Sequence, residues 1–232
     1  MKKNPKISII VPVLNEIELL PKLIQSLTNL PSNILEVIFV DGGSTDGSLE
    51  LLKNKTVVKL IESKKGRAKQ MNMGAKSASG DILYFIHVDT VLPKDFESHI
   101  VSYYNQGFLA GCFRMKFTSD HLLLKISQWF TRFNFSICRG GDQTFYIQKK
   151  LFDQLNGFNE EYIIYEDNEL TNRIYQNRYK FKVIPKYVYT SARRYEEKGY
   201  WKLQYHFARV HLLKIFGANP FELYNYYKKN IA

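Results

Sequence analysis

Apolar residues in the N-terminal half occur in short runs separated by segments with a helical period. The runs are rich in β-branched and aromatic residues and end at polar residues or glycine, which is typical of buried strands. They comprise residues 6–11, 35–40, 56–61 and 82–86. Helical spacing of apolar residues fills the intervals, at residues 20–27, 49–52 and 66–78. This alternation predicts a mostly parallel sheet with crossover helices on its faces.

The first of these helices has a recognisable start signal. Asn15 is followed three residues later by Glu18, which is the spacing of a capping box. We therefore expect a helix that is capped by Asn15 and closed by Pro31.

The pattern after Pro93 is looser but still alternates. Helices are expected over 95–105, 121–135 and 149–155, with another opening at Tyr165, and strands over 109–117, 144–148 and 182–185. The segment 200–227 is aromatic and basic, and Gly217 and Pro220 interrupt it. Because no repeat or low-complexity linker separates the halves, we expect one domain, with a boundary between its halves near residues 91–95.

Polar residues follow two of the predicted strands, at the sheet edge where open α/β sheets bind ligands. His87 and Asp89 come after the run 82–86 and are two residues apart, so they lie on one side of an extended chain and suit a metal ion or a sugar. Asp41 ends the strand 35–40 before two glycines, where a carboxylate suits a nucleobase edge or a ribose. The alternatives are a polar pair that merely ends a strand, and an Asx-turn at Asp41.

Charged residues at predicted helix starts suggest further chemistry. Arg67 begins a helix after Gly66, which is a natural seat for a diphosphate, although a solvated basic turn has the same composition. Glu166 and Asp167 begin another helix. Acidic side chains there either are simply stabilised by the helix dipole or include a general base. Arg193 and Arg194 follow the last predicted strand and suit either bidentate phosphate contacts or a charged loop.

Composition narrows the class of partner. The net charge of +11 suggests phosphate-bearing ligands, nucleic acid or an anionic membrane surface. Cys112 and Cys138, the two cysteines, have no metal or disulfide spacing, which fits a reducing, cytoplasmic setting. The N-terminal pattern predicts a first strand rather than a signal peptide, and no apolar run is long enough to span a membrane.

The aromatic and basic tail allows two hypotheses. Its apolar residues are Trp201, Tyr205, Phe207, Leu212, Leu213 and Phe216, and its cations are Lys202, Arg209 and Lys214. This composition suits a helix at an anionic lipid surface, and it equally suits an ordinary helix packed on the sheet.

Seven short motifs, taken in order, resemble those of the family 2 glycosyltransferases, which have the GT-A nucleotide-sugar fold. They are SIIVPVLNE, EVIFVDGGSTDGS, GRAKQMNMGA, GDILYFIHVDT, RGGDQTFY, YEDNEL and SARR. Within the family the chain looks closest to a small soluble branch with an HxDT metal motif and a GDQ loop. The resemblance implies an α/β, Rossmann-like, mostly parallel sheet flanked by helices, in one domain over 1–232. Its parts would be a nucleotide-sugar half (1–93), an acceptor and catalytic half (94–199) and amphipathic C-terminal helices (200–232).

The resemblance also implies a donor site and an acceptor site. The residues implied at the donor are Pro12, Asn15, Glu16, Asp41, Arg67, His87, Arg193 and Arg194. Asp41 would recognise uridine, and the two arginines would close over the pyrophosphate. The residues implied near the acceptor and the donor sugar are Gly141, Asp142 and Gln143.

Asp89 is implied to bind a divalent cation, Mn²⁺ or Mg²⁺. His87 stands at the first position of the family's usual DxD motif and would either be a second metal ligand, which Mn²⁺ tolerates better than Mg²⁺, or hydrogen-bond the ribose. Asp167 is implied as the general base, with Glu166 supporting it.

These residues imply an inverting transferase that moves a sugar from a UDP-sugar to an acceptor hydroxyl, lipid-linked or on a glycan. The expected setting is cytoplasmic, with peripheral contact at the inner membrane face through the tail, and no nucleic-acid partner is expected. Two alternatives remain: a sugar nucleotidyltransferase and a non-catalytic basic protein that binds nucleotides or nucleic acid.

Overall fold

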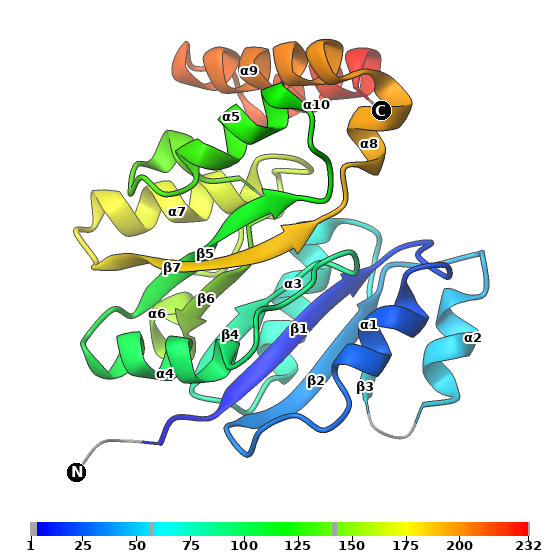
Figure 1. The fold of residues 1–232 in the computed structure, drawn as a ribbon, viewed down its shortest axis with the longest axis vertical. Helices are drawn as coiled ribbons and strands as arrows, with labels where there is room; N and C mark the ends of the chain where they lie inside the picture. Colours follow the sequence, from blue (N-terminus) through cyan, green and yellow to red (C-terminus); the bar gives the residue numbers. More distant parts are fainter. Residues whose placement is uncertain (1–3, 56–57, 141–142, 232) are drawn as a thin grey trace.

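The computed structural model describes residues 4–55, 58–140 and 143–231. Within these residues, seven strands form one sheet in the order β3-β2-β1-β4-β6-β5-β7 (Figure 1). The N-terminal strands are parallel: β1 (Ile7–Val13), β2 (Ile34–Asp41), β3 (Lys59–Glu62) and β4 (Ile82–Phe85). They are connected by α1 (Leu20–Ser26), α2 (Ser48–Lys53) and α3 (Arg67–Ser77). The predicted α/β class is confirmed.

The central strands β1 and β4 are buried on both faces, as their apolar residues require. Successive residues of β1 enter different apolar clusters: Ile9 packs in the cluster that contains Leu20 of α1, and Ile10 in the cluster that contains Met71 of α3. All four residues of β4 are buried. This two-sided burial places the polar ends of the strands, rather than either face, within reach of a ligand.

The C-terminal half extends the same sheet with one reversed strand. β6 (Phe145–Gln148) is antiparallel to both of its neighbours, β4 and β5 (Ala110–Phe117), whereas β5 is parallel to β7 (Phe181–Thr190). The helices of this half are α4 (Phe96–Asn105), α5 (Leu122–Phe130), α6 (Lys149–Gln154), α7 (Glu166–Gln176) and α8 (Arg193–Lys198), with a 3-10 turn η1 (Ser136–Cys138).

The strand predicted over 182–185 is too short. β7 continues to Thr190 through a register shift against β5. Phe113 pairs with Ile184, and the next residue, Arg114, pairs with Tyr187, so Pro185 and Lys186 have no partner on β5. Proline has no N–H to donate, so a bulge is where a strand accommodates it. The extension brings Thr190 to the same sheet edge as Asp89.

Two helix predictions are also corrected. Asn15 does not cap a helix: its φ of 56° is left-handed, and α1 begins at Leu20. The helix predicted over 121–135 ends at Phe130, before η1.

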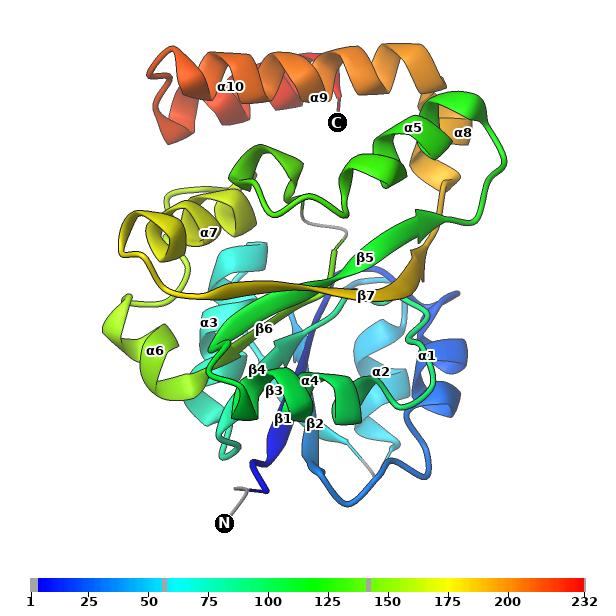
Figure 2. The same ribbon diagram turned by 60° about the vertical axis from the view of Figure 1, so that its left-hand side comes forward.

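The tail forms two helices, α9 (Tyr200–Ile215) and α10 (Pro220–Asn230). Gly217 has a left-handed φ of 91°, and Asn219 caps α10 in a capping box with Glu222. Figure 2 shows α9 and α10 at one end of the molecule, above α5, with the sheet below. In the part of the chain that the structure describes, no helix has the length and apolar character needed to cross a bilayer.

Candidate functional site

A cavity of about 310 Å³ opens at the sheet edge where β1 and β4 end. Its walls come from both halves of the chain, including the segment after β7 and the inner side of α9. The residues that line it are Pro12, Val13, Leu14, Glu16, Leu19, Arg67, Gln70, His87, Val88, Asp89, Thr190, Ser191, Arg193, Arg194, Tyr195, Leu203 and Phe207. Seven of the predicted site residues are among them.

Side chains from the loop after β2 hold the loop after β1. Ser44 Oγ accepts a hydrogen bond from the Asn15 N–H at 3.0 Å, and Asn15 Oδ1 accepts one from the Thr45 N–H at 2.8 Å. Further along, Ser48 Oγ accepts from the Glu16 N–H at 2.9 Å. These contacts explain why Asn15 is not a helix cap: its side chain has a partner on the neighbouring loop. Asn15 itself does not line the cavity, but its contacts position Glu16, which does.

Asp41 is buried at the end of β2, and its two oxygens differ. Oδ1 accepts hydrogen bonds from the N–H groups of Gly43 and Ser44, at 2.8 and 2.9 Å, which is the Asx-turn. Oδ2 is buried and has no hydrogen-bond partner among the described residues. The local turn therefore leaves one buried acceptor without a partner, although Asp41 is not among the residues that line the cavity.

Gln70 of α3 was missed at the level of sequence. It is 3% exposed, and its Nε2 donates to the carbonyls of Val13 at 2.7 Å and Val40 at 2.8 Å, which ties the ends of β1 and β2 together. Gly42 makes room for it, because a Cβ there would lie 2.8 Å from the Gln70 Cδ. Gln70 lies in the motif GRAKQMNMGA, but the motif does not indicate this role, since the partners of Gln70 are backbone atoms of distant strands.

Asp89 and His87 line the cavity together. Asp89 Oδ2 accepts hydrogen bonds from Thr190 Oγ1 at 2.9 Å and the Ser191 N–H at 3.2 Å, which orient the carboxylate. Burial lowers the pKa of His87 well below its usual range, and the nearby Arg67 lowers it further. A neutral imidazole is the form that binds metal.

The described residues contain no group of three His, Cys, Asp or Glu side chains placed to hold a metal by themselves. One carboxylate and one neutral imidazole beside a cavity nevertheless fit a cation whose other ligands are substrate phosphates and water, which is how such ions are commonly held. The residues present therefore fit a divalent cation that binds together with its substrate.

Arg67 connects the cavity to the two predicted catalytic acids. Its Nε lies 2.6 Å from Glu166 Oε1, and its Nη2 forms an ion pair with Asp167 Oδ2. Glu166 is buried, and Asp167 and Arg67 are partly exposed. The three charged groups form one network at the start of α7.

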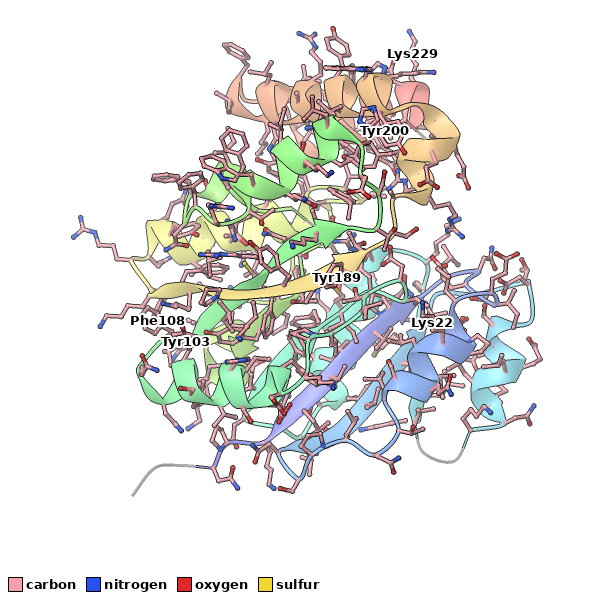
Figure 3. The ribbon with its side chains drawn as sticks, viewed as in Figure 1. Lys22, Tyr103, Phe108, Tyr189, Tyr200 and Lys229 are labelled. Atoms are coloured by element: carbon pink, nitrogen blue, oxygen red, sulfur yellow. The ribbon has the colours of Figure 1, made fainter. Side chains whose placement is uncertain are left out.

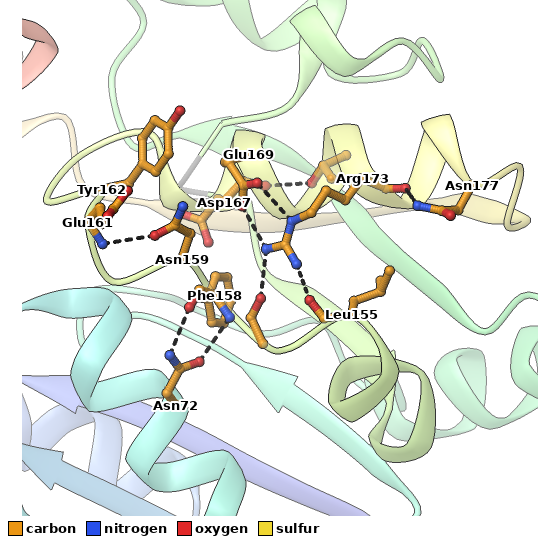
Figure 4. Close-up of polar contacts among 12 residues, drawn as sticks. Asn72, Leu155, Phe158, Asn159, Glu161, Tyr162, Asp167, Glu169, Arg173 and Asn177 are labelled. Carbon is orange, nitrogen blue, oxygen red and sulfur yellow. Dashed lines mark hydrogen bonds and ion pairs between the residues drawn. The ribbon is translucent and has the colours of Figure 1, made fainter. Parts of the chain in front are cut away.

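The position of α7 depends on contacts with the loop before it (Figure 4). Arg173 pairs with Glu169 at 2.6 Å and donates to the carbonyls of Leu155 and Gly157. Asn72 of α3 donates to the Phe158 carbonyl and accepts from the Phe158 N–H, each at 2.9 Å. These bonds join α7 and its loop to α3, which carries Arg67.

The two arginines after β7 have different surroundings. Arg193 Nη2 lies 4.0 Å from Glu16 Oε2, and burial raises the pKa of Glu16 while Arg193 opposes this shift. Arg194 donates to the Tyr227 hydroxyl at 2.6 Å, and its guanidinium lies 5.9 Å from the ring centre of Phe207. Arg193 thus lies across the cavity from Glu16, and Arg194 connects the cavity wall to the C-terminal helices.

The predicted acceptor loop is described only in part. Gly141 and Asp142 lie outside the described residues. Gln143 is buried, its Oε1 accepts from the Gly140 N–H at 3.3 Å, and its Nε2 has no partner among the described residues. Gln143 does not line the cavity, so its role stays a prediction.

The fold and the edge-of-sheet site together define a GT-A-type protein. The chain belongs to glycosyl transferase family 2, whose profile matches residues 8–159. The resemblance to the family, stated from the motifs, is confirmed.

Relatives and solved structures agree with this membership. A probable glycosyltransferase, YdaM of Bacillus subtilis, is 23% identical over 90% of this chain and 56% of its own length. The undecaprenyl-phosphate 4-deoxy-4-formamido-L-arabinose transferase of Yersinia enterocolitica is 31% identical over 46% of this chain and 36% of its own length. The chain thus spans between about one third and just over half of these relatives.

Two solved structures share the fold. The mannosyltransferase PcManGT from Pyrobaculum calidifontis, in complex with GDP-Man and Mn²⁺, has a TM-score of 0.67 at 19% identity and covers 96% of this chain and 69% of its own. Residues 1–349 of S. aureus TarS in complex with UDP have a TM-score of 0.65 at 21% identity and cover 80% and 60%. At these identities the likeness establishes the fold.

Proposed function

We propose that the protein transfers a sugar from a UDP-sugar to an acceptor hydroxyl, with inversion at the anomeric carbon and with a divalent cation. One observation carries the proposal: the cavity at the sheet edge is lined by Asp89, His87 and Arg193 and is joined through Arg67 to Asp167. It therefore combines groups that suit a diphosphate with a carboxylate that suits proton abstraction.

The donor would enter between the loops after β1 and β2. The unpaired Oδ2 of Asp41 is the acceptor that a uracil N–H requires, and its burial makes the lost hydrogen bond costly unless a ligand supplies a donor. Pro12 and Glu16 supply cavity wall, and Asn15 supports the loop that carries Glu16. Two solved structures with this fold are complexes with UDP and with GDP-Man, which supports a nucleotide ligand.

Asp89 and His87 would hold the cation, which would supply positive charge to a leaving diphosphate. Arg193 would add a guanidinium from the opposite wall, and Arg194 would remain tied to Tyr227 beside it. Preorganised positive charge of this kind is commonly the largest electrostatic contribution to catalysis.

Asp167 would accept the proton of the acceptor hydroxyl as that oxygen attacks the anomeric carbon from the face opposite the diphosphate. Before the donor binds, Arg67 occupies Oδ2 of Asp167. A diphosphate in the cavity would compete for the guanidinium and release this oxygen. Glu166 would keep Arg67 in place. The acceptor is a lipid-linked or glycan hydroxyl, and Gly141, Asp142 and Gln143 would lie near it.

Thermal unfolding with a panel of nucleotides tests the proposal. UDP with Mn²⁺ should raise the Tm by roughly 5–10 °C at a hundredfold excess over Kd, and by more than UDP alone. Asp89→Asn should remove the part of the shift that depends on Mn²⁺. The proposal fails if no uridine nucleotide shifts the Tm.

The same experiments separate the alternatives. A larger shift with UTP than with UDP or a UDP-sugar would favour a nucleotidyltransferase. A salt-dependent shift of DNA or RNA in a gel, without any nucleotide effect on the Tm, would favour a nucleic-acid binder.

A further inference from the structure

The helix α9 is apolar on two opposite sides. Leu203 and Val210 are buried on its inner side. On its outer side, Trp201, Tyr205, Leu212 and Ile215 are 74%, 60%, 43% and 65% exposed. Their spacing, with Ala208 between them, gives steps of four and three residues, which is one continuous stripe along a helix. A surface helix ordinarily presents polar residues there.

The helix α5 repeats this arrangement. Leu122, Ile126 and Trp129 follow at steps of four and three residues and are 71%, 49% and 46% exposed, whereas Leu124 is its one buried residue. Most of the apolar side chains of α5 thus face outward. Packing on the sheet below therefore does not account for its composition.

The two helices are neighbours at one end of the molecule. The rings of His121, which caps α5, and Tyr200, which begins α9, are stacked with centroids 3.8 Å apart, and the Tyr200 hydroxyl lies 3.3 Å from Ser119 Oγ. Figure 3 labels Tyr200 where the two helices meet. We call the two stripes the α5–α9 surface: Leu122, Ile126, Trp129, Trp201, Tyr205, Leu212 and Ile215.

The charged residues within α5 and α9 are all cations. Neither α5 nor α9 contains an aspartate or a glutamate. Lys202 and Arg209 are exposed on α9, and the Arg132 guanidinium lies 4.8 Å from the ring centre of Trp129. Lys125 of α5 is also exposed, and it pairs with the exposed Asp120 before the helix at 2.8 Å. Apolar and aromatic side chains interspersed with cations are typical of helices that lie in the headgroup region of an anionic bilayer.

We propose that the α5–α9 surface docks the protein on an anionic lipid bilayer. A second copy is a poorer occupant, because a symmetric contact would place Lys202 and Arg209 against the same cations without an acid in either helix to pair with them. The contact is interfacial, since no described helix is able to span the bilayer.

Docking of this kind would bring the candidate site close to the lipid. Leu203 and Phe207, on the inner side of α9, line the cavity. A single helix, about 10 Å thick, therefore separates the cavity from the proposed contact. An acceptor carried by the membrane would have a short path to the site, but the lipid contact itself does not depend on the proposed transferase activity.

Flotation with phosphatidylcholine vesicles, with and without phosphatidylglycerol, tests the proposal in the absence of nucleotide. The full chain should float with the anionic vesicles at low salt and remain free with the neutral ones. Trp201→Ser/Tyr205→Ser/Ile215→Ser should lose binding by about tenfold or more, because it removes buried apolar area from the lipid contact. Leu35→Ser/Met73→Ser, which removes exposed apolar side chains outside this surface, should bind like the unaltered protein.

A charge-matched pair of variants tests the electrostatic part. Lys202→Glu/Arg209→Glu should weaken binding by about tenfold or more, whereas Lys55→Glu/Lys64→Glu, with the same change in net charge, should have a small effect. Thermal unfolding checks that all variants fold. Absence of binding to anionic vesicles would overturn the proposal. An equal loss of vesicle binding in the variants of the α5–α9 surface and in their respective controls would also overturn it. A dimer in solution that Trp201→Ser/Tyr205→Ser/Ile215→Ser converts to a monomer would also overturn it, in favour of a second copy.

Discussion

Arg67 of α3 forms an ion pair with Asp167 of α7, which lies 100 residues further along the chain. The same guanidinium reaches Glu166, so one side chain of the N-terminal half contacts two adjacent acids of the C-terminal half. This contact couples the cavity to the proposed base. It predicts that binding of a diphosphate and activation of an acceptor are linked through Arg67.

Replacing the proposed base should separate binding from turnover. Asp167→Asn keeps the size of the side chain but removes its ability to take up a proton, so turnover should fall by about 10²–10⁴. The shift in Tm caused by UDP with Mn²⁺ should be retained or increased, because the neutral side chain no longer competes with the diphosphate for Arg67. Steady-state kinetics and thermal unfolding measure the two effects, and unchanged turnover would remove Asp167 from the mechanism.

Removing Arg67 should cost stability, because it leaves the buried Glu166 without its counterion. Arg67→Met should lower the free energy of unfolding by about 1–3 kcal/mol, a range that allows for the partial exposure of Arg67. Adding Glu166→Gln should recover part of the loss, since a neutral amide costs less to bury. Chemical unfolding of the two single variants and the double variant gives the coupling energy. Additive losses would show that the pair is not coupled.

The hydroxyl of Thr190 should matter for the cation rather than for the nucleotide. Thr190→Val removes the donor to Asp89 Oδ2. The apparent affinity for Mn²⁺ in the presence of UDP should fall by about 10–100-fold. Thr190→Ser retains the hydroxyl and should restore most of it. Mn²⁺ titrations followed by thermal unfolding provide the comparison. Equal behaviour of the two variants would argue against orientation of Asp89 by Thr190.

Gly74 is needed where α3 packs on the sheet. A Cβ at this position would lie 2.5 Å from Ile10 Cγ2 and 3.0 Å from Val40 Cγ2. Alanine favours a helix by about 1 kcal/mol over glycine, but crowding a packed core costs about 1–3 kcal/mol, so Gly74→Ala should be destabilising on balance. Gly140→Ala is the control, because among the described residues other than its chain neighbours no heavy atom lies within 4 Å of the added Cβ. A rise in Tm for Gly74→Ala would contradict this packing.

His211 should make the protein less stable in acid. Burial lowers the pKa of His211 in the folded chain, and its ring lies 5.2 Å from that of Tyr165, which precedes α7. Below a pH of about 6.5 the unfolded chain binds a proton that the folded chain resists, so the free energy of unfolding falls as the pH falls and levels off below the folded pKa. His211→Phe should remove this part of the pH dependence. Urea unfolding between neutral and acidic pH measures it, and parallel curves for the two proteins would contradict it.

Short-range patterns predict several residues of the candidate site. Asp41 and Asp89 were identified because each follows a buried apolar run, and parallel strands bring such ends to one edge of a sheet. Asn15 and Pro185 were misjudged for the same reason. Each resembles a local signal, a helix cap or a strand end, but Asn15 bonds to Thr45 of the next loop and Pro185 lies in a bulge of β7. A local sequence signal fails where the side chain or backbone makes a more favourable contact with a distant part of the chain.

The sequence by itself determined the alternation of strands and helices, the edge at which the polar residues gather and the family to which the chain belongs, because apolar periodicity and motif order are properties of neighbouring residues. Only the tertiary structure decided that Gln70 ties β1 to β2, that Thr190 orients Asp89, that Arg67 pairs with Asp167, and that α5 and α9 present apolar stripes outward. These contacts join residues far apart in the chain. They depend on how whole elements pack, which no pattern of adjacent residues records.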